Sequence, residues 1–222
     1  MGFEAGSMNA EGEAVWIYGK WVQAPAQDRS ERTFFRFLDA AEQLLAGRHW
    51  HEVSVQEIVR RAKASVGSFY NRFSDKTALL HCLDDRLGLE CEVTIHHLMT
   101  ELEACPALIV EMPGIVISLL IRLCTERRGV IRALDLAQKM SAADSFSGLG
   151  PRFDTALETL SAFMREHDEQ FAAYSSSAIA LAFREVFWLA RENLLYENPD
   201  MNERALHKSL LHHFEASLKD KS

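Results

Sequence analysis

The side chains best suited to contact a large polyanion lie between Ser65 and Lys76. Tyr70 and Lys76 can donate to phosphate oxygens, and such contacts position a protein on a duplex without reading its sequence. Asn71 and Arg72 carry donors and acceptors that can pair with base edges in the major groove. This combination of residue types predicts a segment that binds double-stranded DNA.

The elements that would hold these side chains are two short helices joined by a tight turn. Ser54 and Glu57 have the spacing of a capping box, in which each side chain bonds the other residue's backbone N–H. Residues 63–64 are too short for anything but a turn. Ser65 is a second N-cap, and a helix of about eight residues follows it. Two helices joined by so short a turn match a helix-turn-helix motif.

The hydrophobic pattern predicts how these helices pack. Val66, Phe69 and Phe73 can face inward, at spacings of three and four residues. An upstream helix over residues 31–46 supplies a buried stripe, and Trp50 is expected to fill the core of this three-helix head. The stripe comprises Phe34, Phe37, Leu38, Ala41, Leu44 and Leu45.

This stretch resembles the DNA-binding motif of the tetracycline-repressor (TetR) family of bacterial regulators, over residues 32–80. Lys63 and His49 stand where the family usually has glycine, so both positions are candidates for a left-handed backbone. The residues that carry the resemblance are Ile58, Ala62, Ser65, Gly67, Ser68, Phe69, Tyr70, Phe73, Lys76 and Leu79. The candidate DNA-contacting residues are Ser54, Lys63, Ser65, Val66, Gly67, Ser68, Tyr70, Asn71, Arg72 and Lys76.

The charge distribution agrees with a DNA-binding head. The whole chain has a net charge of −8, from 24 Lys and Arg against 32 Asp and Glu. Residues 29–80 hold nine basic and six acidic side chains, which gives +3 and leaves −11 for the remainder. An acidic body repels phosphate and so limits non-specific DNA contact to the head.

The remaining chain is predicted to be helical throughout, so the fold class is all-α. Helices are expected over residues 75–88, 89–104, 113–127, 129–140, 151–167, 175–197 and 202–219, with a loop at 141–150. We expect three parts: an irregular extension (1–28) containing the aromatic segment 15–21, the helix-turn-helix domain (29–80), and a helical effector-binding and dimerisation domain (81–222).

The resemblance implies that the body binds a small, apolar or aromatic effector and forms a homodimer. Candidate pocket residues are Leu119, Leu123, Met140, Phe146, Phe153, Phe163, Phe187 and Trp188. Small residues at 175–182 would let helices from two subunits approach closely and form a four-helix bundle. The candidate interface residues are Ala178, Ala182, Val186, Leu189, Leu210 and Phe214.

Other kinds of chemistry find little support. The His96–His97 and His212–His213 pairs cannot chelate a metal from one helix face, because adjacent side chains point about 100° apart. No nucleophile-elbow, Walker-type or dinucleotide motif occurs, so we expect no enzyme activity, metal or cofactor. The four cysteines are scattered and predict reduced thiols in a cytoplasmic protein. The longest apolar runs, such as 115–121, are too short to span a bilayer.

The sequence therefore predicts a one-component transcriptional regulator, most simply a repressor. A homodimer would bind a palindromic DNA operator and be released by its effector. The alternative is a helical module that binds small molecules or proteins and no longer binds DNA.

Overall fold

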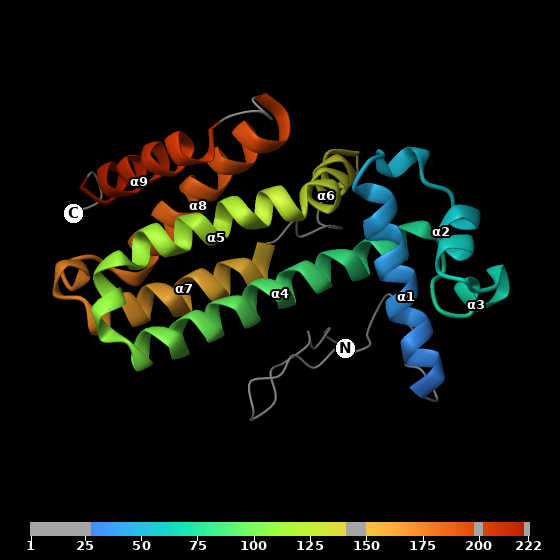
Figure 1. Cartoon of the computed structure of the whole chain (residues 1–222), viewed down its shortest axis with the longest axis horizontal. Coiled ribbons are helices and arrows are strands. Elements are labelled where there is room, and N and C mark those ends of the chain that lie inside the picture. Colours follow the sequence, from blue (N-terminus) through green and yellow to red (C-terminus); the bar gives the residue numbers. More distant parts are fainter. Residues whose placement is uncertain (1–27, 141–149, 198–201, 220–222) are drawn as a thin grey trace. The chain divides into compact units, whose positions relative to one another are not determined.

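The computed structural model describes residues 28–140, 150–197 and 202–219, and every regular element in these ranges is helical, as predicted (Figure 1). The aromatic segment 15–21, nearly all of the predicted extension, and Phe146 with most of its loop lie outside the described residues. The chain divides into two compact units. Unit 1 comprises residues 1–93 and 129–149, and unit 2 comprises residues 94–128 and 150–222.

Unit 1 contains the predicted three-helix head: α1 (Asp28–Leu45), α2 (Val55–Arg61) and α3 (Val66–Tyr70), with a 3-10 turn, η1 (Trp50–Glu52), before α2. Its centre is an aromatic cluster. The ring of Phe73 lies 5.8 Å from that of Phe34 and 4.9 Å from that of Phe69, while Phe37 meets Phe69 edge-on at 5.5 Å. All four rings are fully buried, so α3 is fixed to α1 by close aromatic packing.

Two details of the head differ from the sequence analysis. The second helix of the motif is shorter than expected, because α3 ends at Tyr70 and residue 73 reaches the core from the following turn. Trp50 is only half-buried, so it lies at the edge of the core that it was expected to fill. Its ring is covered by the Lys76 ammonium, 4.5 Å from the ring centroid.

One long helix, α4 (Lys76–Ala104), replaces the two helices predicted over residues 75–88 and 89–104. Asp75 caps it, because its Oδ1 accepts from the Ala78 N–H at 2.8 Å. Gly88 lies inside the helix and is buried. A helical glycine costs about 1 kcal/mol relative to alanine, and burial of leucines on both sides of Gly88 offsets that cost.

The last helix of unit 1, α6 (Arg128–Met140), starts in close contact with the end of α1. A Cβ placed on Gly129 would lie 2.1 Å from the Leu45 carbonyl oxygen, far inside van der Waals contact. Only glycine fits at this position without a shift of one helix.

Unit 2 is a helical bundle built from α5 (Met112–Glu126), α7 (Gly150–His167), α8 (Ser176–Glu192) and α9 (Glu203–Lys219). Helix α8 packs against all three of the others, and α5 also packs against α9. Shorter elements complete the unit: the 3-10 turns η2 (Pro106–Glu111) and η3 (Glu169–Phe171), and η4 (Asn193–Glu197). The predicted α-helix over 175–197 therefore ends at Glu192 and continues as a π-helical turn.

The segment formed by η2 and α5, Pro106–Glu126, is long and apolar enough to cross a membrane by length and composition, unlike the shorter runs considered above. It is the one such segment in the described residues. Core helices of soluble proteins pass the same test, and α5 buries a stripe of side chains against α8 and α9. Apolarity of this segment is thus weak evidence for a membrane span.

Candidate nucleic-acid interface

The first helix of the motif, α2, is fixed at its start by the predicted capping box. The Ser54 hydroxyl accepts from the Glu57 N–H at 3.2 Å, and the Glu57 carboxylate accepts from the Ser54 N–H at 2.9 Å. Arg48 donates to the same carboxylate at 2.5 Å. These hydrogen bonds, led by that from Arg48, lower the pKa of Glu57 to about 2. The charged cluster ties α2 to the preceding loop.

The turn between the two helices has the left-handed residue that the sequence suggested. Lys63 has φ of 50° and is exposed, whereas His49, the other candidate, has an extended backbone with φ of −80°. Arg36 of α1 stabilises the turn, because its guanidinium donates to the Ala62 carbonyl at 2.8 Å and also to that of Lys63. The angle between α2 and α3 is therefore supported from α1.

The second helix, α3, presents a mixed surface. Its N-cap Ser65 accepts from the Ser68 N–H at 3.0 Å, and the two hydroxyls lie 2.8 Å apart. Val66, expected to face inward by its spacing, is instead 46% exposed, and Tyr70 is 55% exposed. Asn71 is exposed as the C-cap. An exposed valine beside polar side chains suits contact with a thymine methyl group.

Lys76 bonds to backbone groups within the head, whereas its chemistry had suggested a phosphate contact. Its ammonium donates to the carbonyls of Trp50 and Val53, each at 2.8 Å, and lies over the Trp50 ring. Burial lowers the pKa of this ammonium. Two of its three donors are thus used within the head, and Lys76 joins the start of α4 to η1.

The remaining candidates also have defined places. Ser54 and Ser65 are exposed but act as helix caps, Gly67 is exposed, and Arg72 is half-buried. Gln56 and Arg60 on α2 are exposed and were absent from the candidate set. They lie four residues apart and so share one face of α2, a spacing that could have grouped them as candidates. The exposed residues of α2, the turn and α3 combine cationic, hydrogen-bonding and apolar groups, as DNA readout requires.

The predicted effector-pocket residues are dispersed. In unit 2, Phe153 and Phe187 are buried with ring centroids 4.8 Å apart, and Phe163 stacks on His167 at 4.0 Å. Leu119 and Leu123 are half-buried on α5. Met140, in unit 1, and Trp188 are 78% and 48% exposed. Among the predicted pocket residues that the structure describes, Phe153 and Phe187 thus form a close aromatic contact.

Most of the predicted dimer-interface residues lie in the core of their own chain. Ala182, Val186, Leu210 and Phe214 are buried, and the Phe214 ring stacks on Phe183 of α8 at 4.3 Å. The helical spacing of apolar residues that suggested an interface forms the contact between α8 and α9 of one chain. These four side chains are covered within the single chain, whereas Ala178 is half-buried and Leu189 is exposed.

Among the described residues, no group of three His, Cys, Asp or Glu side chains could hold a metal ion. The thiols of Cys82, Cys91 and Cys124 are buried and that of Cys105 is exposed, and none of the four forms a disulfide. Burial raises the pKa of the Cys82 thiol above its ordinary value.

The head matches a known family of regulators. Residues 37–83 fit the family model described as "Bacterial regulatory proteins, tetR family". This range contains the last part of α1, both helices of the motif and the first part of α4. A search of curated proteins finds no match.

Solved structures resemble the chain over most of its length. A TetR transcriptional regulator from Rhodococcus sp. RHA1 has a TM-score of 0.55 at 16% identity, covering 88% of this chain and 100% of its own. A transcriptional regulator from Aquifex aeolicus VF5 has a TM-score of 0.56 at 18% identity, covering 83% of this chain and 98% of its own. NalD, the secondary repressor of the MexAB-OprM multidrug efflux pump in Pseudomonas aeruginosa, has a TM-score of 0.55 at 16% identity. The match covers 84% of this chain and 97% of NalD. At these identities the likeness shows a shared fold.

Proposed function

We propose that this chain, whose residues 37–83 fit the family model of TetR-type regulators, is a cytoplasmic, homodimeric transcriptional repressor that a small molecule releases from its operator. The single observation that carries the proposal is the exposed surface of α2 and α3 on a rigid aromatic core. Val66, Tyr70 and Asn71 project from a helix that the core holds in place. Relatives in this family are regulators, and we propose no enzyme activity.

Different residues of the proposed DNA-binding surface would contact phosphates and bases. Lys63 and Arg60, both exposed and cationic, would contact phosphates on either side of α3. Asn71 and Val66 would meet base edges, Asn71 by hydrogen bonds and Val66 by apolar contact. Loss of a phosphate contact weakens binding to all sequences alike, whereas loss of a base contact relaxes specificity at one position.

Dimerisation would use the outward side of α8 rather than the buried residues first considered. Leu181, Trp188, Leu189 and Tyr196 are exposed, although each is large and apolar. They recur at intervals of seven, one and seven residues, so they follow one side of α8 and η4. An exposed apolar stripe of this kind marks a protein interface. A dimer would present two α3 helices to successive major grooves of a palindromic site, about 34 Å apart.

Release by an effector follows from differential binding. The effector would favour a conformation whose two α3 helices no longer match that groove spacing. By thermodynamic linkage, operator DNA must then weaken effector binding by the same factor. Independent binding of effector and operator would contradict this part of the proposal.

The test is a genomic-fragment selection with purified protein, run beside Tyr70→Ala and Asn71→Ala. We expect a few palindromic fragments with wild type, weaker recovery of these fragments with Tyr70→Ala, and altered or lost sequence preference with Asn71→Ala. Glu158→Gln, an exposed change on α7 in unit 2, serves as a control that retains recovery. Failure to enrich any fragment at low salt would favour a helical module that has lost DNA binding.

A further inference from the structure

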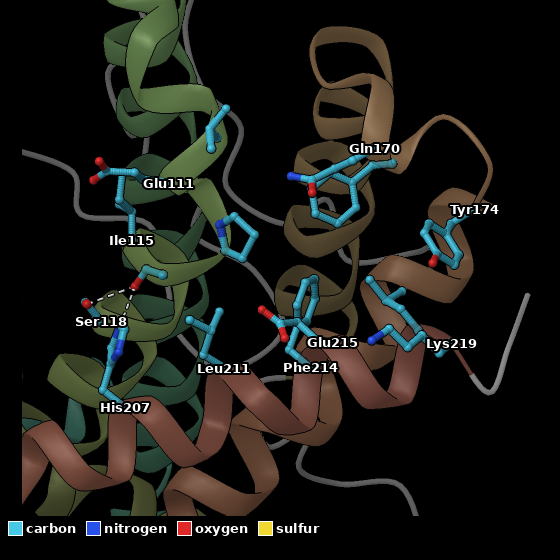
Figure 2. Close-up of a pocket in the computed structure, with 15 residues that line it drawn as sticks. Glu111, Ile115, Ser118, Gln170, Tyr174, His207, Leu211, Phe214, Glu215 and Lys219 are labelled. Carbon is cyan, nitrogen blue, oxygen red and sulfur yellow. Dashed lines mark hydrogen bonds between the residues drawn. The ribbon is translucent and has the colours of Figure 1, made fainter.

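Unit 2 contains an open cavity that neither the predicted pocket residues nor the head explains. It has a volume of about 820 Å³ and lies between the start of α5, the η3 segment and α9 (Figure 2). A volume of this size is in the range of small-molecule sites. Its lining contains none of the residues predicted for the effector pocket.

The wall between α5 and α9 is held by hydrogen bonds. His207 Nε2 donates to the Gly114 carbonyl at 2.8 Å, and the Ser118 hydroxyl donates to the same oxygen at 2.9 Å (Figure 2). Since one carbonyl accepts both bonds, the first turns of α5 and α9 are fixed to each other beside the cavity. The cavity is therefore largely formed before any ligand arrives.

The inner surface of the cavity is apolar and aromatic. Phe171, Phe214 and Leu218 form buried parts of the lining, and the Phe171 and Phe214 rings lie 6.3 Å apart. Leu211 and Tyr174 are half-buried and reach the cavity from α9 and from the segment after η3 (Figure 2). Such a lining favours a ligand with a flat or aliphatic body.

The charges at the rim indicate which ligands the cavity would favour. Two carboxylates, Glu111 and Glu215, line it against one ammonium, Lys219. Glu215 extends from α9 toward the space next to Leu211, whereas Glu111 points outward from the first turn of α5 (Figure 2). Unit 2 as a whole has 11 Lys and Arg against 16 Asp and Glu, a net of −5. The net negative charge of unit 2 therefore attracts cations, and Glu215 offers a carboxylate at the cavity itself.

We propose that this cavity binds an amphipathic organic cation: its apolar or aromatic body packs on Phe171, Phe214 and Leu211, and its ammonium pairs with Glu215. Ligand binding at this cavity does not depend on whether the protein binds DNA. That the ligand also releases DNA is a further step, which rests on the proposed function.

Dansylcadaverine is a suitable probe, because it joins a fluorescent aromatic body to an alkylammonium group. Its affinity for the full-length protein is compared with those of a neutral N-butyl dansylamide and the anionic dansylglycine. We expect the cation to bind most tightly, and Glu215→Gln to weaken it roughly fivefold, as loss of one solvent-exposed ion pair would. The neutral probe should be unaffected by this substitution.

Two further variants locate the site. Leu211→Trp narrows the cavity next to Glu215 and should weaken binding of all three probes, while circular dichroism checks that the variant folds. Glu158→Gln removes an exposed carboxylate on α7 that does not line the cavity and should change nothing. Equal affinity for the three probes, preference for the anion, or unaltered binding by Glu215→Gln would overturn the proposal.

A parallel DNA-binding assay separates this inference from the proposed function. A protein that binds its operator but not the cationic probe would contradict the proposed ligand site and leave the proposed function intact. Selective cation binding by a protein that enriches no DNA would support the cavity and count against the repressor.

Discussion

At the scale of single residues, the head depends on charged side chains that bond backbone groups. Glu57 accepts from Arg48 and from both donors of Ser54, and its pKa is about 2, below the ordinary value of 4.5. A carboxyl whose pKa is lower in the folded state stabilises the fold above about pH 4.5. That contribution is lost as the pH falls from 4.5 toward 2.

Glu57→Gln should therefore lower the Tm at pH 7, since glutamine keeps the shape of the capping box but loses the charge that Arg48 contacts. The difference in Tm between wild type and variant should shrink as the pH falls from 5 toward 3. Thermal unfolding followed by circular dichroism measures it, with Glu158→Gln as the control. A difference that stays constant over this pH range would mean that the Glu57 charge does not stabilise the head.

Lys76→Met separates the two roles considered for this lysine. The substitution leaves the Trp50 and Val53 carbonyls without their donor, so we expect a loss of about 1–2 kcal/mol in the free energy of unfolding. The slope of log affinity for DNA against log salt should stay unchanged, because the ammonium contacts no phosphate in this account.

Lys63→Met is the matched control for Lys76→Met. Its side chain is exposed, so stability should change little, while the salt slope should fall by about one. Urea unfolding and DNA titrations at several salt concentrations measure both quantities. If Lys76→Met instead reduced the salt slope and left the free energy of unfolding unchanged, Lys76 would contact phosphate after all.

At the scale of elements, local sequence patterns predict the head well. The Ser54–Glu57 box, the Ser65 cap and the stripe of phenylalanines all act over three or four residues, and the structure has each of them. Local patterns did not predict the contacts of Lys76 within the head, because its acceptors lie 23 and 26 residues away in the chain. The buried face shared by α8 and α9 looked like a subunit interface because both kinds of contact bury the same apolar spacing. Spacing alone cannot say which partner covers a face.

The contact between α1 and α6 gives a test at this scale. Gly129→Ala would bring a Cβ to 2.1 Å from the Leu45 carbonyl oxygen, so α6 or the end of α1 must move. We expect a loss of about 1–3 kcal/mol in the free energy of unfolding, the range for overpacked sites. Gly47→Ala is the control, since its Cβ would meet nothing within 4 Å. Equal stability of the two variants would show that this contact is not tight.

At the scale of the whole molecule, the account requires two copies of the chain. Trp188→Glu combined with Leu189→Glu should convert a dimer to a monomer, because both side chains are exposed in the single chain and would be buried between subunits. Met140→Glu, at a more exposed apolar residue outside the stripe, should leave the dimer intact. Sedimentation velocity gives the oligomeric state. A dimer that survives the double substitution would place its interface elsewhere.

The most direct test of the central claim is the salt dependence of binding to an operator recovered in the genomic selection. Fluorescence anisotropy would compare the operator duplex with a scrambled duplex for wild type and Asn71→Ala. The account predicts that log affinity falls linearly with log salt for both duplexes, that wild type prefers the operator by at least about a thousandfold, and that Asn71→Ala shrinks this preference. Equal affinity of wild type for the two duplexes, or binding insensitive to salt, would contradict a DNA-reading head.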